Sequence, residues 1–204
     1  MKSAMKACAI GIRVHSGWGA LVAIAGEAVQ PEVVERRRIE TIDRNAPGAA
    51  QPYHFAKNLP LIDAGKFIAG SAASVTRLAS AAMCEVCDAL RAREYTLVAA
   101  AILLSSGRPL PQLEQILAAH PMIHTAEGEF FRQAFRDACA GLKIPVTGIR
   151  ERDLDQHARS VLGGDGGVLK KKIVAMGKTL GPPWTTDQKT ATLAAAIALA
   201  AAHK

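Results

Sequence analysis

The first apolar segment of the chain alternates with polar residues at a period of two. Ile10, Ile12 and Val14 occupy one face of an extended segment. Arg13 and His15 therefore share the opposite face. This pattern predicts a β-strand that carries two polar side chains on the same side near its end.

Two further strands are expected directly after the first. A Ser16-Gly17 turn signal precedes the apolar segment 21–24, so residues 7–26 predict a tight antiparallel hairpin. Pro31 then opens a third strand, which carries arginines at 36–38. Because proline cannot donate to a strand ladder, an edge position suits this strand. The three strands together predict an antiparallel meander.

A long helix and a buried strand follow the meander. Residues 61–93 have apolar side chains at helical spacing, although Gly65 and Gly70 weaken the first half, so the firm part is expected from Ser71. The continuous apolar run 95–104 has the length of a strand that is buried on both faces. Such a strand is expected to lie inside the sheet, parallel to its neighbours.

The second half of the chain combines helices with one more strand. A helix is expected from Thr125, as its N-cap, to a stop at Gly141. A strand over 144–149 and a glycine-rich loop over 163–167 come next, and the loop leads into a lysine-rich helix. The last helix is predicted over 187–202.

Composition limits the class of protein. Half of the 204 residues are hydrophobic, so residues 1–204 are expected to form a single domain with a sizeable core. The 25 Lys and Arg against 18 Asp and Glu give a net charge of +7, which favours a polyanionic partner such as nucleic acid. The four cysteines are too sparse for a disulfide framework and indicate the cytoplasm. No run of about 20 apolar residues predicts a membrane span.

No metal or cofactor is expected from the cysteines and histidines. Cys84 and Cys87 have C-x-x-C spacing, but they fall within the long helix without a second pair. A packed helix is the preferred interpretation, ahead of a zinc or redox site. His54 and His124 lack H-x-x-H or H-E-x-x-H spacing, so surface or capping positions are expected for them.

The order of these elements resembles that of the ribonuclease H-like superfamily. The second half is most similar to RuvC-type Holliday junction resolvases, on the helix-glycine-strand passage 129–146, the glycine loop, the lysine-rich helix and the final D-x-x-x-A helix. The resemblance implies an α/β fold with a mixed five-stranded sheet, in which an antiparallel opening meander is followed by parallel strands. Helices are then expected on both faces of the sheet.

The resemblance also implies a set of four carboxylates that hold two Mg²⁺ ions. Position by position, the first acid becomes Arg13, and the second falls in 103–105, which has no acid. The last pair becomes Asp187 and Thr190. Because a guanidinium repels cations, we expect a degenerate active site without two-metal nuclease activity.

Polar side chains are expected at the carboxyl ends of the strands, where open α/β sheets bind ligands. The residues considered for a ligand site are Arg13, His15, Ser16, Glu127 and Arg132, and those considered for catalysis are His15, Glu127 and Asp187. Two interpretations of Arg13 remain open. It receives a phosphate or carboxylate, or it pairs with Glu127 or Asp187 and fills the place of the lost metals.

The partner is expected to be nucleic acid or a small anion. Lys170, Lys171, Lys172 and Lys178 form a segment that could follow a phosphate backbone, as the resemblance implies. One alternative is a metal-independent enzyme or ligand-binding protein that uses a rim of Arg13, His15 and Glu127. A third is a scaffolding role as a homodimer.

Overall fold

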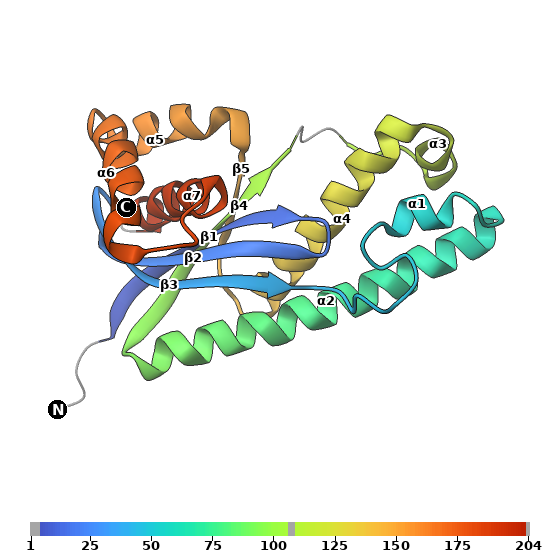
Figure 1. Cartoon of the computed structure of the whole chain (residues 1–204), viewed down its shortest axis with the longest axis horizontal. Helices are drawn as coiled ribbons and strands as arrows, with labels where there is room; N and C mark the ends of the chain where they lie inside the picture. Colours follow the sequence, from blue (N-terminus) through green and yellow to red (C-terminus); the bar gives the residue numbers. More distant parts are fainter. Residues whose placement is uncertain (1–4, 106–108, 203–204) are drawn as a thin grey trace.

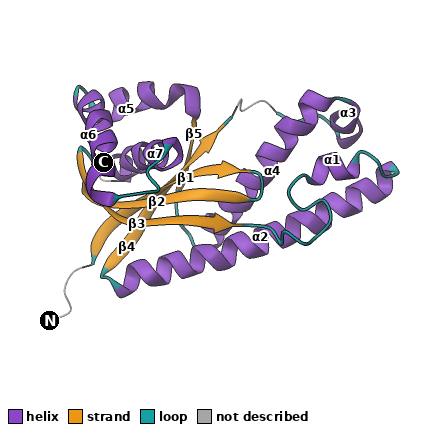
Figure 2. Ribbon diagram, viewed as in Figure 1, coloured by secondary structure: helices purple, strands orange, loops and turns teal. Residues whose placement is uncertain are grey.

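The chain forms one mixed five-stranded sheet with helices on both faces (Figures 1 and 2). The computed structural model describes residues 5–105 and 109–202. The strands are β1 (Lys6–His15), β2 (Trp18–Glu27), β3 (Gln30–Glu40), β4 (Tyr95–Leu104) and β5 (Val146–Arg150). In the order β3-β2-β1-β4-β5, the first three are antiparallel, and β4 is parallel to both β1 and β5. This confirms the expected fold class, with β3 at an edge and β4 inside.

The helices divide between the two faces of the sheet. They are α1 (Pro52–Ala56), α2 (Leu61–Ala92), α3 (Leu113–Ala118), α4 (His120–Gly141), α5 (Leu154–Leu162), α6 (Asp165–Leu180) and α7 (Thr186–Ala202), with a 3-10 turn η1 (Glu151–Asp153) after β5. One core joins Ile10 and Ile12 to α2 and α4. The other core joins Ala9, Val22 and Ile24 to α5, α6 and α7. Successive side chains of β1 therefore pack alternately against the two layers of helices, as the alternation in the sequence predicted.

The last helix lies directly against the backbone of β1. A Cβ atom added to Gly11 would lie 1.9 Å from the carbonyl oxygen of Ala191, so only glycine fits there. Arg13 is two residues further along the same face of β1. The close approach of α7 thus brings Asp187, in its first turn, to the end of β1.

The predicted start of one long helix is confirmed, and that of another is wrong. The long helix α2 begins at Leu61 as predicted, and it is continuous there, although only the part from Ser71 was expected to be firm. α4 begins at His120 instead of at Thr125, because Pro121 occupies one of its first two positions, where its missing N–H costs no helical hydrogen bond. Thr125 does not cap the helix, and its hydroxyl donates to the carbonyl of Pro121.

Part of the predicted glycine loop is helical. α6 already begins at Asp165, so Gly166 and Gly167 belong to its first turn. A Cβ atom at Gly166 would lie 3.1 Å from the carbonyl carbon of Ala158 in α5. The glycine permits close packing of α5 on α6, a tertiary contact that local composition does not reveal.

α2 is long and apolar enough to cross a membrane by length and composition alone, which the sequence reading did not anticipate. Its most apolar window has a mean hydropathy of 1.2 and is 17% buried. Val75, Ala79 and Met83 nevertheless pack into the core beneath the sheet. A helix that covers a sheet passes the same test, so α2 is weak evidence for a membrane span.

Candidate functional site

Arg13 lies near the carboxyl end of β1 and is bound by two carboxylates. Its Nε and Nη2 donate to Oε2 and Oε1 of Glu151 at 3.3 and 2.8 Å. Its Nη1 donates to Oδ1 of Asp187. The Arg13 side chain is one quarter exposed, and all three nitrogens of its guanidinium are engaged. Arg13 therefore bridges two segments that are far apart in the sequence.

The start of α7 is fixed by a reciprocal cap. The Thr185 hydroxyl accepts from the backbone N–H of Asp187 at 3.2 Å. The backbone N–H of Thr185 donates to Oε1 of Gln188 at 2.9 Å. Thr185 is therefore the N-cap of α7. A carboxylate in this first turn is also stabilised by the helix dipole.

An aromatic stack extends the site across the hairpin. Nε2 of His15 lies 3.0 Å from Oδ1 of Asp187. The His15 ring stacks on Trp18 with centroids 4.2 Å apart, and the Arg38 guanidinium lies 3.6 Å from the Trp18 ring centroid. We call Arg13, His15, Glu151 and Asp187 the Arg13 network.

The charges of the network hold one another in the ionised state. Partial burial alone would raise the pKa of Asp187, but hydrogen bonds with Arg13 and His15 outweigh it, and the pKa lies below its usual value. Burial would likewise lower the pKa of Arg13, and the hydrogen bonds with Asp187 and Glu151 raise it instead. The guanidinium and the Asp187 carboxylate are therefore both charged at neutral pH.

A second arginine lies beside β4, where the resemblance implies the second acid. Nε of Arg132 donates to the carbonyl oxygen of Leu103 at 2.9 Å. Burial lowers the pKa of Arg132, an effect that the charges of Glu129 and Glu151 oppose. Its Nη1 is buried and has no hydrogen-bond partner within residues 5–105 and 109–202. This end of the sheet thus carries two guanidinium groups.

The other predicted ligand residues separate from the network. Ser16 is exposed in the turn between β1 and β2. Glu127 is 3% exposed, and its Oε1 accepts from the backbone N–H of His54 at 3.1 Å. Of the two acids expected beside Arg13, Asp187 is therefore present and Glu127 contacts His54 instead. The predicted rim of Arg13, His15 and Glu127 does not form one group.

Glu151 was not among the site residues predicted from the sequence. It follows β5 directly, and a carboxylate at the carboxyl end of a parallel strand is a recognisable signal. The charged run 150–153 hid this signal, because such runs are usually solvated surface. Only the tertiary arrangement singles out Glu151 from its neighbours.

The predicted lysines all lie on α6 and are exposed. Nζ of Lys170 binds Asp155 of α5 at 2.7 Å, and Nζ of Lys172 donates to the carbonyl of Val29 at 3.5 Å. Lys171 and Lys178 are seven residues apart, which places them on one side of the helix, two turns apart. These two lysines form the cationic face of α6.

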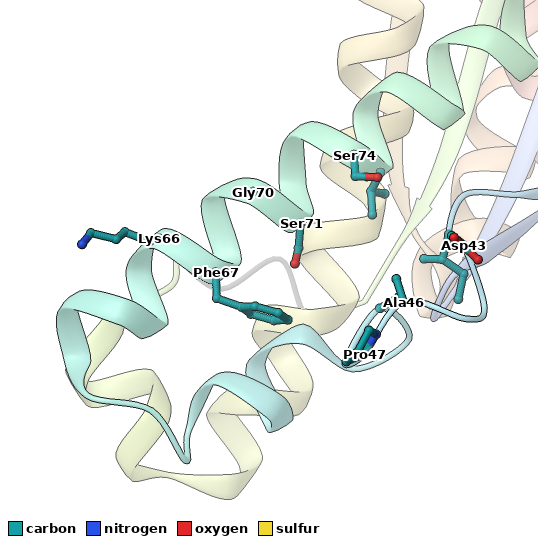
Figure 3. A pocket seen from close by; sticks show the side chains of 11 residues that line it. Asp43, Ala46, Pro47, Lys66, Phe67, Gly70, Ser71 and Ser74 are labelled. Carbon is teal, nitrogen blue, oxygen red and sulfur yellow. The ribbon is translucent and has the colours of Figure 1, made fainter.

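Two cavities lie in different parts of the molecule. One of about 340 Å³ lies beside the Arg13 network, lined by residues that include Glu151, Lys170 and Lys189. The other, of about 380 Å³, lies between α2 and the loop 42–49 (Figure 3). Figure 3 shows the Phe67 side chain turned toward this loop, whereas Lys66 points away. The cavity of about 340 Å³ is therefore the one that places charged side chains beside the Arg13 network.

Comparisons with known proteins agree on the fold. No protein-family model matches the chain, and no curated protein matches it. The structure is similar to that of T. thermophilus RuvC in complex with Holliday junction substrate, with a TM-score of 0.52, 14% identity, and coverage of 93% of this chain and 90% of that one. It is also similar to a Thermus thermophilus RuvC structure, with a TM-score of 0.50, 14% identity and coverage of 93% and 92%. The resemblance to the ribonuclease H-like superfamily, near RuvC, is thus confirmed at the level of the fold.

Proposed function

We propose that this chain is a RuvC-like domain that binds nucleic acid and does not cut it by two-metal chemistry. The observation that carries the proposal is the Arg13 network. Arg13 occupies the position that the family resemblance assigns to the first metal-binding acid, and its guanidinium engages Asp187 and Glu151. An ion-pair network thus takes the place of a metal centre.

The residues present do not fit two Mg²⁺ ions. Mg²⁺ needs oxygen ligands close to octahedral geometry. The carboxylates of Glu151 and Asp187 are both already paired with the fixed positive charge of Arg13. A divalent cation would have to displace Arg13 and then lie beside it, and like charges at such short distances repel strongly.

Three observations support nucleic acid as the partner. The similar RuvC structure is a complex with a Holliday junction. The chain carries a net charge of +7, which attracts a polyanion. Lys171 and Lys178 are exposed on one side of α6, next to the helix that carries Asp187.

The proposed location of the protein is the cytoplasm. The four cysteines are free, which agrees with a reducing compartment.

The small-anion alternative has less support. It requires Arg13 to lie beside Glu127, whereas the guanidinium is bound by the carboxylates of Asp187 and Glu151. Glu127 contacts His54 instead. Nη1 and Nη2 each keep one further N–H donor, but the two bound carboxylates already balance the charge of Arg13, so a phosphate there would lie beside two negative groups.

Fluorescence anisotropy with a labelled four-way junction, a duplex and an RNA tests the proposal. Affinity is expected to fall steeply as salt rises, because binding releases counterions. The double variant Lys171→Glu, Lys178→Glu should bind more weakly, with the slope of log K against log salt reduced by about 2.

Lys57→Glu, Lys66→Glu is the matched control. It changes the net charge by the same amount, at exposed positions on and before α2. If α6 contacts the nucleic acid, the control keeps most of its affinity. Equal losses in both double variants would show that only net charge matters, and no binding at low salt would contradict the proposal.

A further inference from the structure

Three histidines gather at the end of the molecule formed by α1, α3 and the start of α4, away from α7 (Figure 1). His54 comes from α1, and His120 and His124 come from the first turns of α4. One ligand nitrogen from each ring lies within 4.8 Å of the other two. The group shares no residue with the Arg13 network.

We propose that these three imidazoles bind a divalent transition metal, Zn²⁺ by preference. Imidazole suits zinc, copper and nickel, whereas Mg²⁺ and Ca²⁺ prefer oxygen ligands. Residues i and i+4 lie on one side of a helix, so His120 and His124 present their rings together. Their Nε2 atoms are 3.0 Å apart.

The geometry is close to that of a tetrahedral site. With Zn–N bonds of about 2.0–2.1 Å, neighbouring ligand nitrogens lie about 3.3 Å apart. The two α4 nitrogens are already near that spacing. The widest separation, 4.8 Å, must shorten by about 1.5 Å to reach the same value. His120 and His124 are exposed, so rotation of their side chains can supply this movement.

The buried Glu127 gives an independent reason to assign a ligand here. Its Oε1 lies 3.0 Å from Nδ1 of His54 and also accepts the backbone N–H of that residue. Nδ1 is buried and makes no well-directed hydrogen bond with any described residue. Metal-binding histidines almost always donate their second ring nitrogen to a carboxylate or carbonyl. Rotation of the His54 ring that directs Nδ1–H at Oε1 of Glu127 would complete this support and leave Nε2 for the metal.

The site combines a supported ligand with an open side. His54 is one fifth exposed and held by the nearly buried Glu127, whereas the α4 histidines face solvent. Three protein ligands leave a fourth position for water. A metal there would link α1 to α4 beside a small hydrophobic core of Ile116, Ile123 and Ala126.

Calorimetric titration of chelator-treated full-length protein with Zn²⁺ tests the assignment. We expect one saturable site per chain, and visible absorption bands of a tetrahedral complex when Co²⁺ replaces Zn²⁺. The melting temperature should rise by about 5–10 °C at a 100-fold excess of Zn²⁺ over its dissociation constant. The double variant His120→Ala, His124→Ala should lose the Co²⁺ bands and bind Zn²⁺ at least 100-fold more weakly.

Two further variants separate a metal site from ring packing. Glu127→Gln should weaken Zn²⁺ binding by about 10–100-fold, because it changes only the support of His54. His157→Ala removes an exposed histidine on α5 and should leave affinity unchanged. Circular dichroism establishes that each variant is folded. Absence of saturable Zn²⁺ binding in the wild type, or equal affinity in the His120→Ala, His124→Ala variant, would overturn the assignment.

Discussion

Arg13 and Glu151, 138 residues apart in the chain, form a two-point ion pair at the end of the sheet. The guanidinium also binds Asp187, so one side chain joins β1, η1 and α7. Paired donors and acceptors of this kind are stronger and better directed than single contacts. The network therefore stabilises the fold at the place where a RuvC-like resemblance implies metal chemistry.

The stability lost on replacing Asp187 should depend on pH in a defined direction. The pKa of Asp187 in the folded state lies below its usual value of 3.8, so its contribution is complete above that value and is lost as pH falls through the lower, folded-state pKa. Asp187→Asn should cost about 1–3 kcal/mol at pH 7. In urea denaturation, the gap from the wild type should narrow below about pH 4. Asp88→Asn, at an exposed ion pair on α2, should cost little at either pH.

Arg13→Asp should create a site for a divalent cation. The change removes the guanidinium and adds a third carboxylate beside Asp187 and Glu151. Without metal the three acids repel one another, so Mg²⁺ should raise the melting temperature of this variant. Arg13→Asn, which removes the positive charge without adding a negative one, is the control. Thermal shifts that do not distinguish Arg13→Asp from the wild type would argue against the account of the site.

Gly11→Ala should destabilise the protein severely. The added Cβ would collide with the backbone of Ala191, and α7 cannot move away without opening the core. We expect a loss of more than about 3 kcal/mol in the free energy of unfolding. Gly70→Ala, with nothing within 4 Å of its added Cβ, should stabilise α2 by about 0.5–1 kcal/mol. A mild effect at Gly11 would mean that α7 is not in close contact with β1.

A single cysteine should react quickly in the native protein. Burial raises the pKa of Cys8 to about 11 and that of Cys139 to about 12, and burial also raises the pKa of Cys87. Cys84 is exposed. Thiol titration should therefore show one fast group, which Cys84→Ser removes, and four groups after denaturation. A second fast thiol at Cys87 would favour the redox interpretation of the C-x-x-C spacing.

Much of the fold could be predicted from the sequence because its patterns are local. The alternation around Ile10 and Ile12 predicts β1 and its two faces, and the apolar run of β4 predicts an interior strand. Boundaries were less accurate where tertiary packing overrides propensity. The sequence around Gly166 predicts a loop. In the structure Gly166 lies in the first turn of α6, where it packs against α5.

The candidate site could be predicted only in part. Arg13 and Asp187 were found because a family resemblance assigns both positions a role. Prediction of Glu151 would have needed the strand order of the sheet. β4 lies between β1 and β5, and the ends of β1 and β5 come close enough for Arg13 to bind Glu151. The histidine group needed His54 on α1 to meet the i, i+4 pair on α4, which a search for zinc motifs within one segment does not find.

Incubation of a labelled four-way junction with the protein in Mg²⁺ or Mn²⁺ tests the central claim most directly. The bound and the cut fractions are measured in the same samples. We predict salt-sensitive binding with the junction uncut, in the wild type and in Asp187→Asn alike. Metal-dependent incision by the wild type that disappears in Asp187→Asn would contradict the account, because it would show that the Arg13 network opens to a working metal centre.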